Sequence, residues 1–445
     1  MNSKCSAYIS STLNEVLGEG FTCVEQTRAM QMRLFVFVNN RTLDASKAAI
    51  KAMAIQKENE NTGLGHFLGN KGGQCITLTL NGTSLCFVSC HLSAHEGGKH
   101  LADRNSDCRE IMSGVDVGQK GLDLGSQFHH CFWMGDMNYR VDLGTVEEYH
   151  HLAAGDGKDK KTLQTQKFEI VSDLVTKLDG PDRESALATL HAADELSGAM
   201  ARKDVLVGFE ELPGLPTFHP TFKVHRWEPE KFVVKRTPSY CDRILVKSLP
   251  GFKRNVEAIA YESCPTFVSS DHKPIRAGYS LKQPVRTIKG GSSRFTVTVS
   301  DITVKVEGRA ASKQDVPDMY VKLLADPVNV IKGRSGKDVR TKQVANTTEH
   351  TFADDLTALL HAEEADLGNA HLIFSVMDKD VGSADDPLGS VSLCCGELIP
   401  MVKYTVDESL VLNGLLGGTF QCSVLLAPVS PDEADAGTGG CCTIL

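Results

Sequence analysis

The sequence has no long hydrophobic run and no excess of positive charge. The longest apolar stretches, such as LFVFV at residues 34–38, are too short to cross a bilayer. No charged and then apolar leader opens the chain, so we expect no secretory signal. The formal net charge is −9, whereas a nucleic-acid partner usually requires a basic balance or a basic stripe. We therefore expect neither a membrane-spanning nor a nucleic-acid-binding protein.

Disulfide and zinc patterns are also missing, although the 445 residues include 14 cysteines. No two cysteines have the spacing C-x-x-C, and most lie in apolar runs, as Cys86, Cys131 and Cys241 do. Such cysteines pack as small hydrophobic side chains, and reduced thiols are typical of the cytosol. The pattern predicts a cytoplasmic protein with unpaired cysteines.

The pattern of predicted secondary structure changes once along the sequence, which predicts two domains. Residues 1–281 alternate β-branched apolar runs with polar helical stretches, the pattern of a mixed α and β domain. Residues 282–293 contain one proline, two glycines and two serines, and we predict a linker there. Short alternating strands at residues 294–428 predict an all-β sandwich. Residues 429–445 are predicted to be a disordered acidic tail.

Four groups of polar residues interrupt the apolar strands of the first domain. Each group lies at a strand end or in the following loop, where catalytic residues usually occur. The groups are GNKGG at 69–73 with CHLSAH at 90–95 and RNSD at 104–107, FWMGDMNYR at 132–140, LPTFHPTFK at 215–223 with KRTPSYCDRIL at 235–245, and SSDHKP at 269–274.

These residue types suit the hydrolysis of a phosphate ester, which needs a metal, an oriented water and cations around the phosphate. Asp136 and Asn138 are two apart at a strand end, so we expect them to point to one side and align water and phosphate. Asp271 offers a carboxylate beside His272, whose imidazole can take part in proton transfer. Asp242 can hold that imidazole in the useful tautomer.

Taken singly, each residue has a simpler explanation. A strand-end aspartate is more often a turn residue, a lone histidine such as His91 is more often hydrogen-bonded in a core, and Lys223 alone would be a solvated lysine. The functional interpretation rests on the combination and its order along the chain.

FWMGDMNYR and PTFK with RTPSYCDRIL resemble signatures of the inositol polyphosphate 5-phosphatases, within the deoxyribonuclease-I-like superfamily. The resemblance runs from about residue 10 to residue 279 and includes GFEEL at 208–212. It implies an α+β four-layer α/β/β/α sandwich and a Mg²⁺ cofactor. It also implies removal of the 5-phosphate from phosphoinositides, such as phosphatidylinositol 4,5-bisphosphate and 3,4,5-trisphosphate, or from soluble inositol polyphosphates.

The resemblance also assigns roles to individual residues. The reaction centre would comprise His91, Asp136, Asn138, Asp242, Asp271 and His272, with Asp271 in a partial Mg²⁺ site. Phosphate contacts would come from Lys71, Tyr139, Arg140, Lys223, Lys235, Arg236 and Arg243. In the loop at residues 63–70, Phe67 and Leu68 are candidates for contact with lipid, the alternative being a buried loop anchor.

One part of the family pattern is missing. The family's domain opens with a strand ending in Asn and a strand ending in Gln-Glu, whose Glu binds the metal. Residues 7–38 resemble the region after that Glu, and Glu25 lies too far along to replace it. We expect a true start upstream of Met1; without the ligand, Mg²⁺ binding and turnover should be weak. The alternative is a catalytically impaired, membrane-bound scaffold that binds phosphoinositides.

Residues 294–428 resemble a C2 domain, a β-sandwich that binds calcium and lipid. The resemblance is carried by PDMYVKLL at 317–324, RTKQVANTTEHTF at 340–352 and FSVMDKDVGSADDPLGSVSL at 374–393. Converging carboxylates suit Ca²⁺, and the candidates are Asp318, Asp378, Asp380 and Asp386. The alternative is a C2 fold that binds no calcium and packs on the catalytic domain. A basic run could meet anionic lipid or be a solvated edge strand: Lys332, Arg334, Lys337, Arg340 and Lys342.

The chain ends in Cys442-Thr443-Ile444-Leu445, which fits the C-a-a-X prenylation pattern, and a final leucine favours geranylgeranyl. Palmitoylation of Cys441 would add the second anchor that stable membrane binding needs; the alternative is a chance pair of cysteines. The sequence thus predicts a peripheral protein on the cytosolic face of phosphoinositide membranes. A nuclease of the same superfamily is disfavoured by PTFK, RTPSYCDR and the acidic charge.

Overall fold

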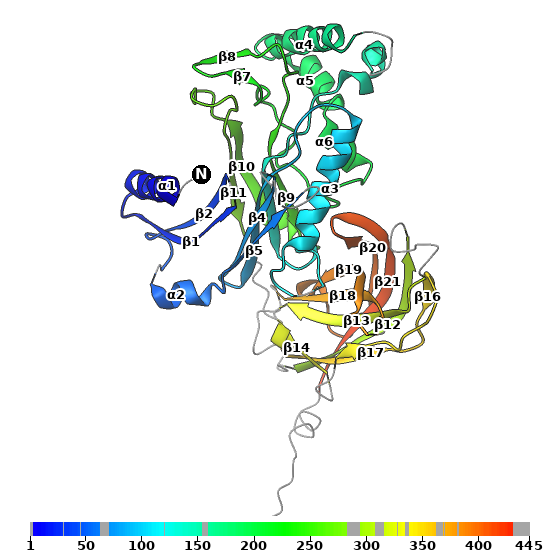
Figure 1. Ribbon diagram of the computed structural model, residues 1–445. Coiled ribbons are helices and arrows are strands. Elements are labelled where there is room, and N and C mark those ends of the chain that lie inside the picture. The colour runs from blue at the N-terminus through cyan, green and yellow to red at the C-terminus, as the bar shows by residue number, and fades with distance from the viewer. Residues whose placement is uncertain are drawn as a thin grey trace, which may run out of the picture.

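The computed structural model describes residues 3–29, 31–44, 46–62, 71–119, 121–153, 159–282, 294–307, 316–326, 328–333, 338–361, 368, 370–380 and 382–429. The part up to residue 282 mixes helices and strands, and the part from residue 294 consists almost entirely of strands (Figure 1). The predicted lipid contacts Phe67 and Leu68 lie outside the described residues, as does the tail with Cys441 and Cys442. Within the described part, no helix is long and apolar enough to span a membrane.

A five-stranded sheet forms the centre of the first part, in the order β3-β4-β5-β6-β9. Strands β5 and β6 are parallel, and the other neighbours are antiparallel. The register pairs His91 with Asp136 and Asp136 with Asp242, so three predicted site residues lie side by side where their strands meet the loops. The strands are β3 (Gln56–Asn61), β4 (Gly72–Leu80), β5 (Thr83–His91), β6 (His130–Asp136) and β9 (Asp242–Ser248).

Layers cover both faces of this sheet, which explains why most residues of β4 and the first four of β6 are buried on both sides. On one face, α3 (Gly98–Gly114) and α6 (Glu195–Ala201) pack around Trp133 and Ile111. On the other face, two separate hairpins pack around Phe132. These hairpins are β1 (Phe21–Ala29) with β2 (Met32–Asn39), and β10 (Val256–Ser263) with β11 (Ile275–Leu281).

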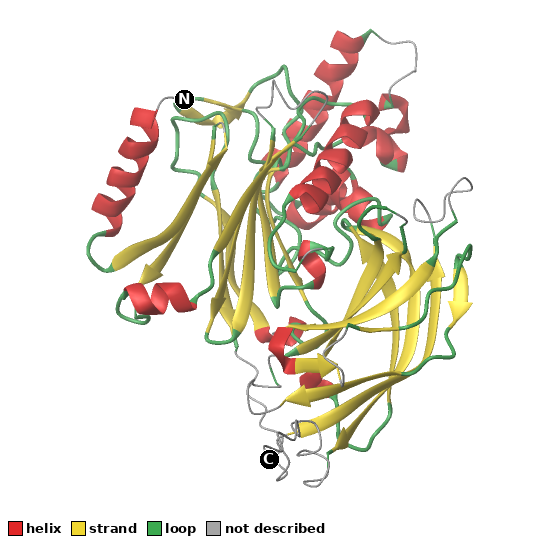
Figure 2. Ribbon diagram, turned by 60° about the horizontal axis from the view of Figure 1, so that its bottom comes forward, coloured by secondary structure: helices red, strands yellow, loops and turns green. Residues whose placement is uncertain are grey.

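The helix α1 (Ser3–Leu17) lies outside the first hairpin and completes the four-layer sandwich that the resemblance implied (Figure 2). Two further helices, α4 (Lys160–Lys177) and α5 (Arg183–Ala192), build a core of their own beside the sheet, and a short helix, α2 (Lys47–Ala52), follows β2. Among the described residues, eleven cysteines are free and nine of them are buried, which confirms the prediction of unpaired, packed thiols.

The second part is a β-sandwich of the C2 type. Its strands follow one hydrogen-bonded path, β14-β17-β12-β21-β20-β19-β18-β13-β15, with β16 paired to β12. The strands fold over a core in which the rings of Phe374 and Phe420 stack at 5.1 Å. They are β12 (Arg294–Val306), β13 (Met319–Asp326), β14 (Ile331–Gly333), β15 (Val339–Arg340), β16 (Glu349–Thr351), β17 (Leu356–His361), β18 (His371–Asp378), β19 (Asp386–Cys394), β20 (Tyr404–Leu412) and β21 (Leu415–Pro428).

The two parts contact one another through hydrogen bonds. Asp123 accepts a bond of 2.7 Å at Oδ2 from the backbone amide of Gly414. The hydroxyl of Ser392 donates to the carbonyl of Ser126 at 2.7 Å, and the amide of Gln119 donates to the carbonyl of Ala325 at 3.0 Å. This packing agrees with the alternative in which the C2 fold docks on the catalytic domain.

Candidate active site

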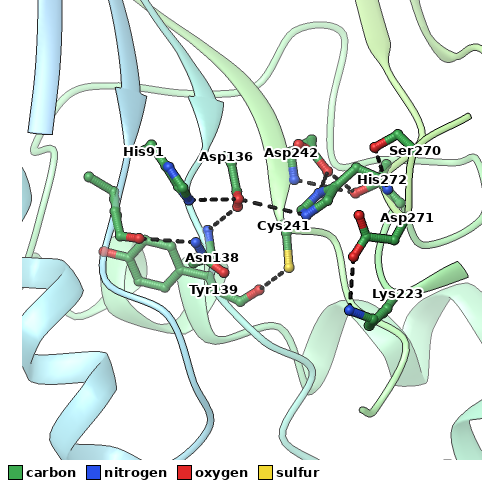
Figure 3. Close-up of polar contacts among 12 residues, drawn as sticks. His91, Asp136, Asn138, Tyr139, Lys223, Cys241, Asp242, Ser270, Asp271 and His272 are labelled. Atoms are coloured by element: carbon green, nitrogen blue, oxygen red, sulfur yellow. Dashed lines mark hydrogen bonds and ion pairs between the residues drawn. The ribbon is translucent and has the colours of Figure 1, made fainter. Parts of the chain in front are cut away.

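Asp136, at the end of β6, lies between two imidazoles (Figure 3). Its Oδ2 is 3.3 Å from Nε2 of His91, at the end of β5, and 3.8 Å from Nε2 of His272, in the loop before β11. Burial acts to raise the pKa of Asp136, but the neighbouring His91, His272 and Lys71 outweigh it and lower the pKa overall. Asp136 is therefore held as a carboxylate.

Asp242, the first residue of β9, holds the second imidazole. Its Oδ2 lies 2.9 Å from Nδ1 of His272 and accepts a bond of 2.6 Å from the hydroxyl of Thr221. Burial acts to lower the pKa of His272, but the hydrogen bond and charge of Asp242 raise it overall. Burial raises the pKa of Asp242. The pair orients the imidazole with Nε2 directed toward Asp136, as its contact with that residue shows.

The sequence predicted that Asn138 would point to the same side of a strand as Asp136, but Asn138 lies beyond the end of the strand. β6 ends at Asp136, and Asn138 adopts a left-handed backbone with φ of 56°. Its backbone amide donates to Oδ1 of Asp136 at 3.1 Å, and its side-chain amide donates to the carbonyl of Leu92 at 3.0 Å. Its Oδ1 accepts from Arg140 at 2.5 Å. Asn138 therefore braces Asp136 and Arg140, and its amide is already engaged.

Arg140 is the strongest candidate for a phosphate contact. Its side chain is 3% exposed, and its guanidinium lies 4.7 Å from the ring centre of Phe222. Only one guanidinium bond, to Asn138, occurs among the described residues, and Nε and Nη1 have no partner there. Buried donors without a partner cost free energy, so these two nitrogens suit an anionic ligand.

Other cations gather around the same place. Nζ of Lys71 lies 2.5 Å from Nε2 of His91, and burial lowers the pKa of this lysine. Burial and then nearby positive charges, including Arg236 and Arg140, lower the pKa of His95. His95 was not predicted as a site residue, although it closes the CHLSAH motif. Lys235 is exposed.

The carboxylate of Asp271 pairs with two basic side chains. Its carboxylate lies 2.8 Å from Nζ of Lys223 and 3.3 Å from Nη2 of Arg226. Burial acts to raise the pKa of Asp271, but these bonds prevail and hold it at about 2. Its role as a magnesium ligand stays a prediction, because the carboxylate pairs with Lys223 here. The same pairing partly neutralises the charge that Lys223 was expected to offer to phosphate.

Two predicted phosphate contacts are wrong. Arg243 is 1% exposed, and its guanidinium pairs with Asp194 at 2.9 Å and with Glu211 at 2.5 Å. Tyr139 is fully buried, and its hydroxyl donates to Oδ1 of Asn105 at 2.7 Å. Both side chains are held by partners inside the core, so neither offers a free donor to a phosphate.

A second buried ion pair braces the loop after β6. Nη2 of Arg104 lies 2.5 Å from Oε2 of Glu195, and the same oxygen accepts from the backbone amide of Arg140 at 2.8 Å. The sequence contained Arg104 in the RNSD motif but gave no signal for Glu195, because the two residues lie far apart along the chain.

The residues present fit a divalent cation. Ligand atoms of Asp136, Asp242 and His272 all lie within 4.8 Å of one another. Carboxylate oxygens are the ligands that hard divalent cations prefer, and a sparse protein ligand set with remaining water is typical of Mg²⁺.

The predicted calcium site is not assembled. No group of three ligands that includes Asp318, Asp378, Asp380 or Asp386 lies within 4.8 Å in the described part. Instead, Asp318 accepts from the amide of Asn346 at 2.9 Å, and Oδ1 of Asp378 accepts from the amide of Asp318 at 2.8 Å. These carboxylates are used to hold the loops together.

The basic run of the C2 fold is only partly described. Arg340 lies over the ring of Tyr320 at 5.1 Å, and Lys342 is 3.3 Å from Asp354. Arg334 and Lys337 lie outside the described residues, as does the side chain of Lys332. Contact of this run with lipid stays a prediction.

Carboxylates, imidazoles and cations at the strand ends of a four-layer sandwich are the features of metal-assisted hydrolases that act on phosphate esters. The sequence model of the Endonuclease/Exonuclease/phosphatase family 2 matches residues 1–278, more than half of the chain, and the chain belongs to this family. A C2 domain matches residues 297–410.

Several curated proteins are similar. Phosphatidylinositol 3,4,5-trisphosphate 5-phosphatase 2B of Danio rerio is 27% identical over 418 residues, which cover 90% of this chain and 30% of that protein. Type II inositol 1,4,5-trisphosphate 5-phosphatase of Mus musculus is 31% identical over 51% of this chain and 20% of that protein. This chain therefore spans less than a third of these relatives.

A solved inositol polyphosphate 5-phosphatase domain of a synaptojanin, in complex with inositol (1,4)-bisphosphate and calcium ion, is 24% identical. It aligns with 62% of this chain and 68% of its own, with a TM-score of 0.43.

Proposed function

We propose that this protein removes the 5-phosphate of phosphoinositides, such as phosphatidylinositol 4,5-bisphosphate and 3,4,5-trisphosphate, by metal-assisted hydrolysis at a membrane surface. Soluble inositol polyphosphates are a possible second substrate class. The observation that carries the proposal is the convergence of Asp136, Asp242 and His272, with ligand atoms within 4.8 Å. The names of the similar 5-phosphatases support the choice of substrate.

Asp136 and Asp242 would hold a divalent cation, for which we propose Mg²⁺. When bound, the cation supplies positive charge that polarises phosphoryl oxygens. The Asp136 carboxylate, kept ionised by its neighbours, accepts a hydrogen bond from the attacking water and orients it. His272, held at Nδ1 by Asp242, presents Nε2 to the phosphoryl group and can donate a proton there.

The cations near the site would hold the phosphates. Arg140 offers Nε and Nη1, which have no hydrogen-bond partner among the described residues. These two donors lie on different edges of the planar guanidinium, so each can bond a phosphate oxygen separately, with the positive charge strengthening both bonds. Lys71 and Arg236 add positive charge, and Lys223 can join them when substrate competes for its bond to Asp271.

We further propose that the protein is peripheral on the cytosolic face of membranes. The C2 domain match supports this location. The terminal Cys442, as a prenylation site with palmitoylation at Cys441, would anchor the chain. Phe67 and Leu68 would contact the lipid beside the substrate.

The test measures phosphate release from vesicles that carry either phosphoinositide and from soluble inositol polyphosphates, with and without Mg²⁺. We expect Mg²⁺-dependent release from the 5-position, and a loss of about 10²-fold or more in Asp136→Asn and His272→Gln. His350→Gln in the C2 fold is the matched control and should keep the wild-type rate. Vesicle binding without hydrolysis would instead establish the scaffold alternative, and release from DNA ends the nuclease.

A further inference from the structure

A short hairpin lies at the edge of the proposed active site. Its strands β7 (Val224–His225) and β8 (Glu228–Phe232) are joined by a loop of two residues, Arg226 and Trp227. The first backbone amide of β7 donates to the carbonyl of Asp271 at 3.0 Å. Figure 1 shows the hairpin at the end of the molecule away from the C2 fold. The hairpin therefore belongs to the rim of the active site.

The tip of this hairpin carries a large side chain in an unusual position. Trp227 is 72% exposed, and within the described part of the chain its indole stacks on no ring and donates no hydrogen bond. Its backbone is left-handed, with φ of 69°, a conformation that glycine or asparagine adopts with less strain. Turn chemistry would favour such a small residue here. The local fold therefore does not account for a tryptophan at this tip, and strain of this kind is typical of functional positions.

The neighbouring loop before β11 adds a second exposed ring. The backbone amide of Trp227 donates to the carbonyl of Val268 at 2.7 Å, so the tip of the hairpin lies against this loop. Phe267, the preceding residue, is 45% exposed. Nζ of Lys273 holds the loop from inside by donating to the carbonyls of Pro265 and Phe267, each at 2.9 Å. Two exposed aromatic rings therefore lie on adjoining, anchored segments.

The same edge of the domain carries exposed cations. The side chain of Arg226 is 63% exposed, although its Nη2 lies 3.3 Å from Oδ1 of Asp271. Lys235, three residues after β8, is exposed as well. Lys231 is paired with Glu228 and adds little net charge. Anionic headgroups attract exposed cations near a bilayer surface, so the charge of this edge is complementary to an anionic membrane.

The size of this surface favours a bilayer over a protein partner. A stable protein interface buries roughly 800 Å² on each partner and needs a matching shape. A contact with a bilayer needs only apolar side chains and a favourable charge. Two rings flanked by cations meet the second requirement.

We propose that Arg226, Trp227, Lys235 and Phe267 form a docking edge that rests on the bilayer carrying the substrate, with Trp227 in the headgroup interface. Tryptophan is favoured at this depth because its ring is apolar and its N–H finds polar partners there. Because β7 is bonded to the backbone of Asp271, docking of the tip would hold the reaction centre at a fixed height above the headgroups. This inference rests on the proposed function and names the element that brings the catalytic domain to its lipid.

The first test uses fluorescence, because the chain has two tryptophans and only Trp227 is exposed, whereas Trp133 is fully buried. The full chain, produced without prenylation, is mixed with vesicles of phosphatidylcholine and phosphatidylserine that carry phosphatidylinositol 4,5-bisphosphate, with EDTA present to prevent hydrolysis. We expect a blue shift of the emission, protection from acrylamide and quenching by brominated lipid. Trp227→Asn should lose these responses and bind the vesicles about tenfold more weakly. Its melting temperature should not fall, because asparagine suits the left-handed backbone.

Ile259→Asn is the matched control, because Ile259 is also 72% exposed but lies on β10, outside the docking edge. This variant should bind the vesicles as the wild type does. Emission that vesicles leave unchanged, which a protein partner at this edge would predict, overturns the proposal, and so does an equal loss of binding in both variants. Should Trp227→Asn fail to fold, quenching of the wild type by brominated lipid decides alone.

A second measurement separates this inference from the proposed function. With Mg²⁺ present, the rate of phosphate release from vesicles is divided by the rate from soluble inositol polyphosphate. We expect this ratio to fall about tenfold in Trp227→Asn and to keep its wild-type value in Ile259→Asn. An unchanged ratio in an active protein overturns the docking edge. If the wild type releases phosphate from neither substrate, the proposed function fails, and the fluorescence test still decides whether the docking edge exists.

Discussion

Nδ1 of His272 lies 2.9 Å from Oδ2 of Asp242, the same oxygen that accepts the hydroxyl of Thr221. This oxygen joins the imidazole in the loop before β11 to the end of β9. Because Asp136 lies on the neighbouring strand, the pair also sets how closely Nε2 approaches that carboxylate. The geometry of the proposed reaction therefore depends on one carboxylate that need not touch the substrate.

Asp242→Asn should lower the pKa of His272. The carboxylate raises that pKa in the native protein, so the protonated imidazole persists to higher pH than in the variant. We expect NMR titration of His272 to move to lower pH and kcat to fall by about 10²–10⁴-fold. Thr221→Val, which keeps the carboxylate, should show a smaller change; an unaltered titration in Asp242→Asn would contradict the assigned role.

Asp271 should contribute to stability above its unfolded pKa and lose that contribution in acid. Its folded pKa is about 2, compared with 3.8 for an unperturbed aspartate, so folding favours the ionised form. The contribution is present above about pH 4 and disappears as the pH falls toward 2. Asp271→Asn should therefore show a smaller loss of unfolding free energy between neutral pH and pH 2 in urea titrations.

The control for Asp271 is Glu262→Gln, which removes an exposed partner of Arg276. This variant should lose as much unfolding free energy between neutral pH and pH 2 as the wild type does. A wild-type decline in Asp271→Asn would show that Lys223 and Arg226 do not stabilise this carboxylate.

Arg243→Met should lower the unfolding free energy, because the main role assigned to Arg243 is structural. The substitution leaves Asp194 and Glu211 as buried carboxylates without their cation. Breaking such a pair costs about 3–5 kcal/mol of unfolding free energy. Arg276→Met, at an exposed pair, should cost less than about 1 kcal/mol. Denaturant unfolding measures both, and an unchanged stability in Arg243→Met with lost substrate binding would restore the phosphate-contact prediction.

Arg140→Lys should weaken substrate binding while the charge is kept. A lysine cannot place donors at both the Nε and the Nη1 positions, nor reproduce the contact with Phe222. We expect kcat/KM to fall by about tenfold or more, the equivalent of one good charged hydrogen bond. Arg202→Lys, at an exposed pair with Asp204, is the control and should retain the wild-type value. Equal kinetics in Arg140→Lys would exclude phosphate contacts from Nε and Nη1 of Arg140.

The sequence by itself determined the mixed first domain, the all-β second domain and the packing of the cysteines as unpaired thiols. Strand periodicity and β-branched runs are local properties, so they can be read without knowing the fold. The motifs also supplied the strand-end residues His91, Asp136 and Asp242, because catalytic groups concentrate where strands meet loops.

Only the tertiary structure decided which buried charges are paired and which keep donors without a partner among the described residues. Arg140 and Arg243 look alike in their motifs. Arg243 is enclosed between Asp194, which precedes α6, and Glu211 of the GFEEL segment, whereas Arg140 keeps two donors without a partner in the described part of the chain. The bond between Trp227 and Val268 has no sequence signal, because the two residues lie far apart along the chain. Such contacts are fixed by how distant elements pack, and no local pattern along the chain encodes them.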